Sequence, residues 1–375
     1  MNMNQWPAAN SFSEVASPGL ILNVDLVRGN LSRMMEQVNG DQSRIRPHVK
    51  THKMSRLIEM QLEVGIDQYK VATLAEASMV AGAGAKDILI AYPMVGPNLR
   101  LLVKLIKDYP EVTFSCLVDH RDGLQLIEER HSDLSGSSFG VWIDVDCGMH
   151  RTGIPFGPEF EELQEASIAS ESIQYRGLHV YDGHLHQPDL SDRHGGATII
   201  KEQILTSLAA YPDQEVVVGG SPNFGFWSEQ SSWQCSPGTP LFWDEGYGSN
   251  YPDLEYSPAI ALLSRVISKP GVDRICIDLG YKAVAAEMPL ERRVVFPSLP
   301  DAELLGQSEE HLVLKTSLAN RMQLGQEIIA FPRHVCPTVA LHSSVQVVAG
   351  GRVLDERWEV DARARLQVSP QDSQE

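Results

Sequence analysis

Short apolar runs and helical patterns alternate over the first two thirds of the chain. Residues 56–64, 74–83 and 99–107 carry apolar side chains at spacings of three and four, which predicts amphipathic helices. Between such stretches lie runs rich in β-branched residues, at 46–50, 68–73, 88–93, 113–118, 141–146, 177–182, 215–219 and 233–239. This alternation predicts an α/β fold whose strands close into a TIM-type (β/α)8 barrel.

The pattern changes near residue 256. Further strand-like runs follow without a long helical pattern between them, at 259–268, 274–278, 312–316, 327–331 and 338–348. We therefore expect a barrel domain over residues 26–255 and a C-terminal, mainly β domain over residues 256–375. Segment 1–25 carries a strand at 19–25 that we expect to join the β domain. The polar tail from Ser369 is expected to fray.

Composition and charge exclude several classes of protein. The 375 residues include 31 Lys and Arg against 49 Asp and Glu, a formal charge of −18, which disfavours binding to nucleic acid or to a membrane surface. No apolar run approaches the roughly 20 residues that span a bilayer, and the first 15 residues do not resemble a signal peptide. Five scattered cysteines without a Cys-x-x-Cys pair favour a reducing cytoplasm over a disulfide framework.

Polar residues gather where the predicted barrel strands end. Lys50 ends the first strand, Thr73 the second, Tyr181 and His184 lie at the end of the sixth, and residues 219–221 follow the seventh. The carboxyl ends of barrel strands form the face that carries active sites. The chain is therefore predicted to be an enzyme.

The segment Arg46-Pro47-His48-Val49-Lys50-Thr51-His52-Lys53 is the most unusual part of the sequence. A lysine at a strand end in a barrel mouth can be partly desolvated, which lowers its pKa and makes its amine a nucleophile for an imine. The alternative is a solvated basic loop. So many basic groups around one strand end in an acidic protein favour the imine lysine.

Three further segments offer groups for an anionic, planar cofactor. Gly219-Gly220-Ser221 can turn backbone N–H groups toward a phosphate, although a strand followed by two glycines also forms an ordinary tight turn. Arg151 can hold a phenolate or carboxylate oxygen, or can instead close its loop by pairing with an aspartate such as Asp144. Tyr181 offers a ring to pack on a cofactor, and His184 with His186 offers two imidazoles that could equally be structural.

His334 and Cys336 lie in the predicted β domain. In an extended segment, residues at i and i+2 point to the same face. Imidazole and thiolate together suit Zn²⁺, with water or substrate completing the coordination. The alternative is a buried cysteine beside a hydrogen-bonded histidine.

Taken together, these motifs resemble the D-serine dehydratase / D-threonine aldolase family, whose members are fold-type III pyridoxal phosphate enzymes with an alanine-racemase-like barrel and a C-terminal β domain. The resemblance is strongest at the Lys50 segment and at His334-x-Cys336. It extends to other segments: Lys70-Val71-Ala72-Thr73 with Glu76, and residues 146–153, 181–184, 219–222 and 278–282.

The resemblance implies roles for individual residues. Lys50 would carry pyridoxal 5'-phosphate through an imine, and Tyr181 and His184 would be catalytic with it. Thr73, Arg151 and Tyr181 would contact the cofactor, and Gly219, Gly220 and Ser221 would hold its phosphate. His334 and Cys336 would bind a divalent metal, zinc rather than manganese or magnesium.

Two departures from the family pattern affect the expected contacts. The family's Glu-x-Arg-Pro-Gly segment is here Gln234-Cys235-Ser236-Pro237-Gly238, so an acidic and a basic contact are replaced. The family's Gly-Gly-Ser/Thr-Pro-Thr loop ends here in Asn223, which changes one potential phosphate donor.

The implied reaction acts on a small D-β-hydroxy amino acid. If Lys50 takes the Cα proton and the hydroxyl leaves, the products are a 2-oxo acid and ammonia. If a base takes the hydroxyl proton instead, the Cα–Cβ bond breaks to give glycine and an aldehyde. The family's dehydratases resemble His-x-Cys and its aldolases His-x-Asp, so we expect a D-serine or D-3-hydroxyaspartate dehydratase.

Three other functions share parts of this pattern. A D-threonine or D-3-hydroxy amino acid aldolase uses the same scaffold. An amino acid racemase would use Lys50 but not the metal pair, and a non-catalytic pyridoxal phosphate carrier would be a single barrel without the β domain. A homodimer is expected in each enzymatic case.

Overall fold

A computed structural model describes residues 3–8, 10–134 and 139–367, so the tail from Ser369 that was expected to fray lies outside the described residues. The described chain divides into two compact units. One runs up to Met34 and resumes at Thr239–Arg363, and the other consists of Met35–Gly238 and the chain from Ala364 on. These divisions differ from the borders expected near residues 25 and 255, and the domain borders remain predictions.

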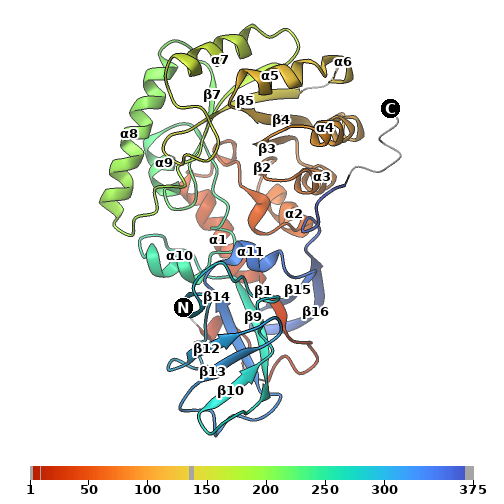
Figure 1. Cartoon of the computed structure of the whole chain (residues 1–375), viewed down its shortest axis with the longest axis vertical. Helices are drawn as coiled ribbons and strands as arrows, with labels where there is room; N and C mark the ends of the chain where they lie inside the picture. The colour runs from red at the N-terminus through yellow and green to blue at the C-terminus, as the bar shows by residue number, and fades with distance from the viewer. Residues whose placement is uncertain (1–2, 9, 135–138, 368–375) are drawn as a thin grey trace. The chain divides into compact units, whose positions relative to one another are not determined.

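The unit over Met35–Gly238 is built on parallel strands separated by helices, as predicted (Figure 1). In the part that the structure describes, its strands lie in chain order: β2 (Gln68–Val71), β3 (Asp87–Pro93), β4 (Thr113–Val118), β5 (Phe139–Val145), β6 (Gln174–Val180), β7 (Glu215–Val218) and β8 (Gln234–Cys235). The helices are α2 (Ser55–Glu63), α3 (Leu74–Gly82), α4 (Pro97–Asp108), α5 (Arg121–Glu128), α6 (His131–Leu134), α7 (Pro158–Ala169), α8 (Leu190–Leu208) and α9 (Phe224–Gln230).

The predicted first strand takes the place between β8 and β2 without forming a regular strand. The Arg46 N–H donates to the Cys235 carbonyl at 2.9 Å, and the Lys70 N–H donates to the Pro47 carbonyl at 2.9 Å. Pro47 has no N–H to donate, so it can only accept from a neighbouring strand. The expectation that Lys50 ends a strand is wrong, because Lys50 lies in a 3-10 turn over Val49–Thr51 whose N-cap is His48.

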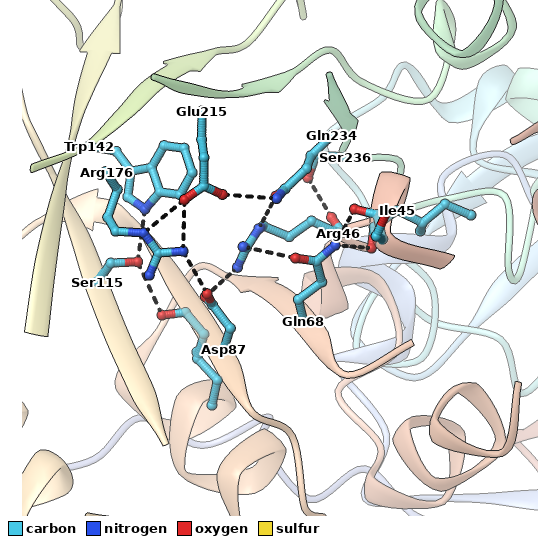
Figure 2. A network of polar contacts seen from close by, with 12 residues as sticks. Ile45, Arg46, Gln68, Asp87, Ser115, Trp142, Arg176, Glu215, Gln234 and Ser236 are labelled. Atoms are coloured by element: carbon cyan, nitrogen blue, oxygen red, sulfur yellow. Dashed lines mark hydrogen bonds and ion pairs between the residues drawn. The ribbon is translucent and has the colours of Figure 1, made fainter. Parts of the chain in front are cut away.

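A polar network lies at the amino ends of these parallel strands (Figure 2). Arg46 is fully buried, and its Nη1 lies 2.6 Å from Asp87 Oδ1, while Arg176 Nη2 lies 2.9 Å from Asp87 Oδ2. Both guanidinium groups stack on Trp142, at 5.7 and 5.5 Å from its ring centroid. The network continues through polar side chains of neighbouring strands: Gln68, Ser115, Glu215 and Gln234.

A bulge in β6 changes which of its side chains lie opposite those of β5. The register with β5 shifts between Val141 and Trp142, so Arg176 is an extra residue. The next residue is Gly177, with φ +146°, and a Cβ there would lie 2.0 Å from the Glu215 carbonyl oxygen. Only glycine tolerates that approach, and after the bulge His179 lies opposite Asp144.

The other unit contains a mainly antiparallel sheet, as predicted. Among the described residues its strands are β1 (Gly19–Asn23), β9 (Ile260–Ser268), β10 (Arg274–Ile277), β11 (Val294–Val295), β12 (Glu303–Gln307), β13 (Leu312–Lys315), β14 (Glu327–Pro332), β15 (Ser344–Ala349) and β16 (Arg352–Glu359). The N-terminal strand β1 pairs with β9 and β15, so it belongs to this sheet. The helices α1 (Val24–Gln37), α10 (Glu245–Asn250) and α11 (Val335–Val339) complete the regular elements.

The strand expected over residues 338–348 is only partly correct, because its first residues belong to α11 and pairing begins at Ser344. All five cysteines are free thiols. Among the described residues, no helix combines the length and the apolar character that crossing a membrane requires.

Candidate active site

Three cationic side chains surround the ring of Tyr181, which directly follows β6. Lys50 Nζ lies 5.8 Å from the ring centroid, Lys70 Nζ lies at 5.7 Å, and Arg151 Cζ lies at 5.4 Å. They come from the 3-10 turn, from β2 and from the loop after β5. Positive charges gathered around one aromatic ring in an acidic protein suit an anionic, planar ligand.

The glycine loop after β7 lies against the same ring. A Cβ on Gly220 would come within 3.2 Å of Tyr181 Cε2, so the loop backbone approaches the ring closely. Gly219 has φ +78°, and a Cβ there would lie 2.4 Å from Trp227 Cδ1. The Ser221 hydroxyl accepts from the Gly238 N–H at 3.2 Å. The structure therefore brings together Lys50, Arg151, Tyr181 and Gly220, which the sequence had selected separately.

Replacing Gly219 with alanine is expected to weaken cofactor binding about tenfold or more, because the left-handed backbone and the Trp227 contact together cost on the order of 1–3 kcal/mol. Affinity for pyridoxal phosphate, measured by titration of its absorbance, tests this. Gly195→Ala is the control, since a Cβ at Gly195 meets open space. Equal affinity of the Gly219 variant and wild type would contradict a phosphate role for the loop.

Asp182 anchors the loop, and sequence reasoning missed this role. The buried carboxylate accepts from Asn223 Nδ2 at 2.9 Å and from Trp227 Nε1 at 2.8 Å. Burial raises the pKa of Asp182, and the two donors oppose that shift. Asn223, noted above as a departure from the family loop, is thus the partner of this aspartate.

Lys70, His179 and Asp144 form a second buried group. Lys70 Nζ lies 3.4 Å from His179 Nε2, and His179 Nδ1 lies 2.7 Å from Asp144 Oδ1. The alternative of an Asp144–Arg151 pair is replaced by Asp144 with His179 and with the Thr152 hydroxyl at 2.8 Å. Lys70 and His179 were missed as site residues, although charged or polar residues inside otherwise apolar barrel strands were a signal available in the sequence.

Two predicted site residues have local structural partners. The Thr73 hydroxyl caps α3 by accepting from the Glu76 N–H at 3.1 Å. His184 packs against the loop after β5, where a Cβ on Gly148 would lie 2.8 Å from its Nε2, and burial lowers its pKa. Direct roles of Thr73 and His184 in cofactor binding or catalysis remain predictions.

The His334–Cys336 segment was expected to be extended, and this expectation is wrong. His334 is the N-cap of α11 and Cys336 lies inside that helix. The Cys336 side chain nevertheless lies close enough to raise the pKa of the His334 imidazole, and His334 Nδ1 lies 2.6 Å from Glu287 Oε1. Burial lowers the pKa of His334, but the contacts with Cys336 and Glu287 outweigh this and raise it to about 9.

Within the described residues, no three His, Cys, Asp or Glu side chains are arranged to hold a metal ion. Imidazole and thiol lie together, however, and a carboxylate on one ring nitrogen is the common outer partner of a ligating histidine. The pair therefore fits a soft divalent metal whose remaining ligands come from water or substrate.

Comparison with known families gives two matches along the chain. Residues 22–245 match the family described as alanine racemase, N-terminal domain. Residues 259–348 match a family described as putative serine dehydratase domain.

Individual relatives match over nearly their full length. A D-threonine aldolase of Arthrobacter sp is 26% identical over 94% of this chain and 93% of its own. A D-threo-3-hydroxyaspartate dehydratase of Delftia sp. strain HT23 is 24% identical over 92% and 96%. The crystal structure of D-threonine aldolase from Filomicrobium marinum superposes with a TM-score of 0.85 at 26% identity, covering 96% of this chain and 98% of that chain.

Proposed function

Since this chain belongs to the alanine racemase N-terminal domain family, we propose that it is a pyridoxal-phosphate-dependent lyase acting on D-β-hydroxy amino acids. The observation that carries the proposal is the convergence of Lys50, Arg151 and the Gly220 backbone on the Tyr181 ring. The relatives named aldolase and dehydratase support the same reaction class, because both act on substrates with a hydroxyl at Cβ.

The residues present fit the cofactor. Its phosphate suits the loop after β7, where Gly220 has no side chain and its backbone lies close to Tyr181. Its ring oxygen suits Arg151, and its aldehyde suits the amine of Lys50. The site lacks the arginine of the family's last barrel segment, where Ser236 instead donates its hydroxyl to the Arg46 carbonyl at 2.8 Å. Lys70 supplies another positive charge within the same site.

The chemistry divides between the cofactor and the chain. When bound, pyridoxal phosphate supplies an electron sink that weakens the bonds at Cα. Lys50 is proposed to hold the cofactor and to accept the Cα proton, and Arg151 to hold the negative ring oxygen. Tyr181 packs beside these groups and fixes the plane in which they act.

The choice between elimination and carbon–carbon cleavage rests on His334 and Cys336. Their soft donor set suits zinc, which would act as a Lewis acid for a leaving hydroxyl and so favours a D-serine or D-3-hydroxyaspartate dehydratase. An aldolase is the second candidate, since a D-threonine aldolase is 26% identical over 94% of the chain. A racemase would share Lys50 but would have no use for the metal pair.

A product assay tests the proposal. Protein loaded with pyridoxal phosphate and Zn²⁺ is offered D-serine, D-threonine and D-3-hydroxyaspartate, with and without a chelator. We expect ammonia and a 2-oxo acid, and we expect the chelator to abolish both. Glycine and an aldehyde would establish the aldolase instead. Conversion of the D-amino acid to its L-enantiomer, without formation of a 2-oxo acid or an aldehyde, would establish a racemase.

The metal pair is tested with two cysteine variants. Cys336→Ala is expected to lower activity and metal content by about tenfold or more, because the loss of even an outer-shell partner of a metal ligand has an effect of that size. Cys276→Ala, at a free cysteine in β10, is the matched control and should retain both. Full activity of Cys336→Ala without added metal would refute the zinc site.

Assembly and location are further proposals from composition and family resemblance. We propose a homodimer in a reducing cytoplasm, with no nucleic-acid or membrane partner, and light scattering of the purified protein tests the dimer.

A further inference from the structure

Inside the parallel-stranded unit lies a chain of three buried side chains that the proposed mechanism does not use. Asp144 on β5 and His179 on β6 are paired neighbours, whereas the contact of Lys70 with His179 joins β2 to β6, which are not neighbours in the sheet order. The side chain of Lys70 also approaches the Tyr181 ring, two residues beyond His179. The chain therefore begins at the candidate active site and runs into the interior.

The hydrogen bonds indicate where the protons lie. Asp144 accepts from the Thr152 hydroxyl through Oδ2 and contacts His179 Nδ1 through Oδ1. His179 pairs with Asp144 by donating the Nδ1–H, which leaves the lone pair of Nε2 facing Lys70 Nζ at 3.4 Å. Lys70 is consequently the donor to His179 as long as the Nε2 of His179 carries no proton.

The surroundings allow the proton of Lys70 to leave near neutral pH. Burial lowers the pKa of Lys70, and repulsion from Lys50 and Arg46 lowers it further, while Asp144 and Asp182 oppose this, so that it falls to about 7. Burial and the charge of Lys70 likewise lower the pKa of His179, against the effect of Asp144. His48, whose pKa is lowered by burial and by Lys50 and Lys70, lies near this amine, and Arg151 further lowers the pKa of His179.

We propose that Lys70 and His179 share one exchangeable proton, balanced by Asp144, and that the position of this proton sets the positive charge beside Lys50 during the reaction. When Lys70 donates, its N–H bond breaks with the electron pair kept on Nζ, and a new N–H bond forms at His179 Nε2. The positive charge moves onto the imidazole, where Asp144 balances it. Return of the proton restores the starting state, so the pair is unchanged after each turnover.

The inference rests on the proposed function and makes it more specific. Both elimination and carbon–carbon cleavage take one proton from the substrate and deliver one later in the cycle. Transfer of the shared proton to His179 leaves Lys70 neutral, so one positive charge moves away from Tyr181 without exchange with bulk water. Lys70 is in this view a positioning residue, because it acts on the reacting atoms through the charge that it presents beside them.

The first test examines the pair in protein without cofactor. The Cε1–H NMR signal of His179, assigned through His179→Gln, is followed from about pH 5.5 to 9, the range in which histidine titrates. In Lys70→Gln the amide can still donate a hydrogen bond to His179, but it is uncharged and does not titrate. The titration midpoint of His179 should therefore shift by about one pH unit or more. Lys107→Gln on the exposed face of α4 is the matched control and should leave the midpoint unchanged.

The second test uses the holoenzyme. The visible band of bound pyridoxal phosphate and the pH profile of kcat/KM should share a transition near pH 7 in wild type and in Lys107→Gln. Both Lys70→Gln and His179→Gln should lose or displace that transition. A purely structural role would lower kcat/KM without moving its midpoint, and unchanged midpoints in either test would overturn the inference.

Failure of the proposed function gives a different result. If borohydride fixes no cofactor to Lys50 and no visible band forms, the pyridoxal phosphate proposal fails. The NMR titration of the cofactor-free protein still decides whether Lys70 and His179 share a proton.

Discussion

Replacing Lys50 with alanine is expected to abolish covalent attachment of pyridoxal phosphate and to lower kcat/KM by at least about a thousandfold, which corresponds to roughly 4 kcal/mol of transition-state stabilisation. The amine of Lys50 is the group that would both bind the cofactor aldehyde and accept the Cα proton. Neither of the other two side chains placed around Tyr181 repeats both tasks, since Lys70 is directed to His179 and the guanidinium of Arg151 does not form an imine.

The measurement is borohydride fixation followed by peptide mass spectrometry, with turnover assayed on the same preparations. Lys50→Arg is the sharper variant, because it keeps the positive charge beside Tyr181 but cannot form an imine, and it should be as inactive as the alanine variant. Lys107→Ala serves as the control. Fixed cofactor found on Lys70 in the wild-type protein would show that Lys50 was wrongly chosen.

Removal of the Asp87 carboxylate is expected to destabilise the fold more than any other single change in the polar network of Figure 2. Asp87 pairs with Arg46 through one oxygen and with Arg176 through the other. Asp87→Ala leaves the buried Arg46 guanidinium with amide partners only, at Gln234 and Gln68. Breaking a buried ion pair by removing one partner costs about 3–5 kcal/mol.

The loss should appear in urea unfolding as a lower midpoint with an unchanged slope. Burial raises the pKa of Asp87, but Arg46 and Arg176 outweigh this and hold it below its usual value. The stabilisation is therefore present above the unfolded-state pKa and is lost as pH falls through the folded-state pKa, so the difference between variant and wild type should shrink in acid. Asp213→Ala, at an exposed turn, should change stability by no more than about 0.5 kcal/mol.

Most of the fold could be predicted because periodicity reports which faces are buried. Residues 113–118 were predicted as a strand and form β4, and the N-terminal run at 19–25 contains β1. Two predictions were wrong for local reasons. Strand pairing ends at His48, which is the N-cap of the 3-10 turn over residues 49–51, and residues 338–339 end a helix that starts after His334.

The candidate site was predictable where chemistry gathers in one segment of sequence. Lys50 lies in a run of basic residues, and Gly219 and Gly220 stand together after a strand, so their residue types alone indicate an imine lysine and an anion loop. Lys70 and His179 each stand between apolar residues of a strand, and Asp182 lies between two residues chosen for other roles, Tyr181 and His184. Nothing in the one-dimensional pattern shows that they meet, because their contacts join strands far apart in sequence.

The alternation of strands and helices, the mainly β character of the C-terminal part and the residue types suited to a phosphate-bearing cofactor could be inferred from local sequence patterns, since each depends on neighbours within a few positions. Which charged groups are partners follows from the folded arrangement alone. The β6 bulge after Arg176 turns His179 toward Asp144, and sheet order brings Lys70 of β2 to His179 of β6. Such pairings depend on register and burial, which are set by the packing of the whole sheet.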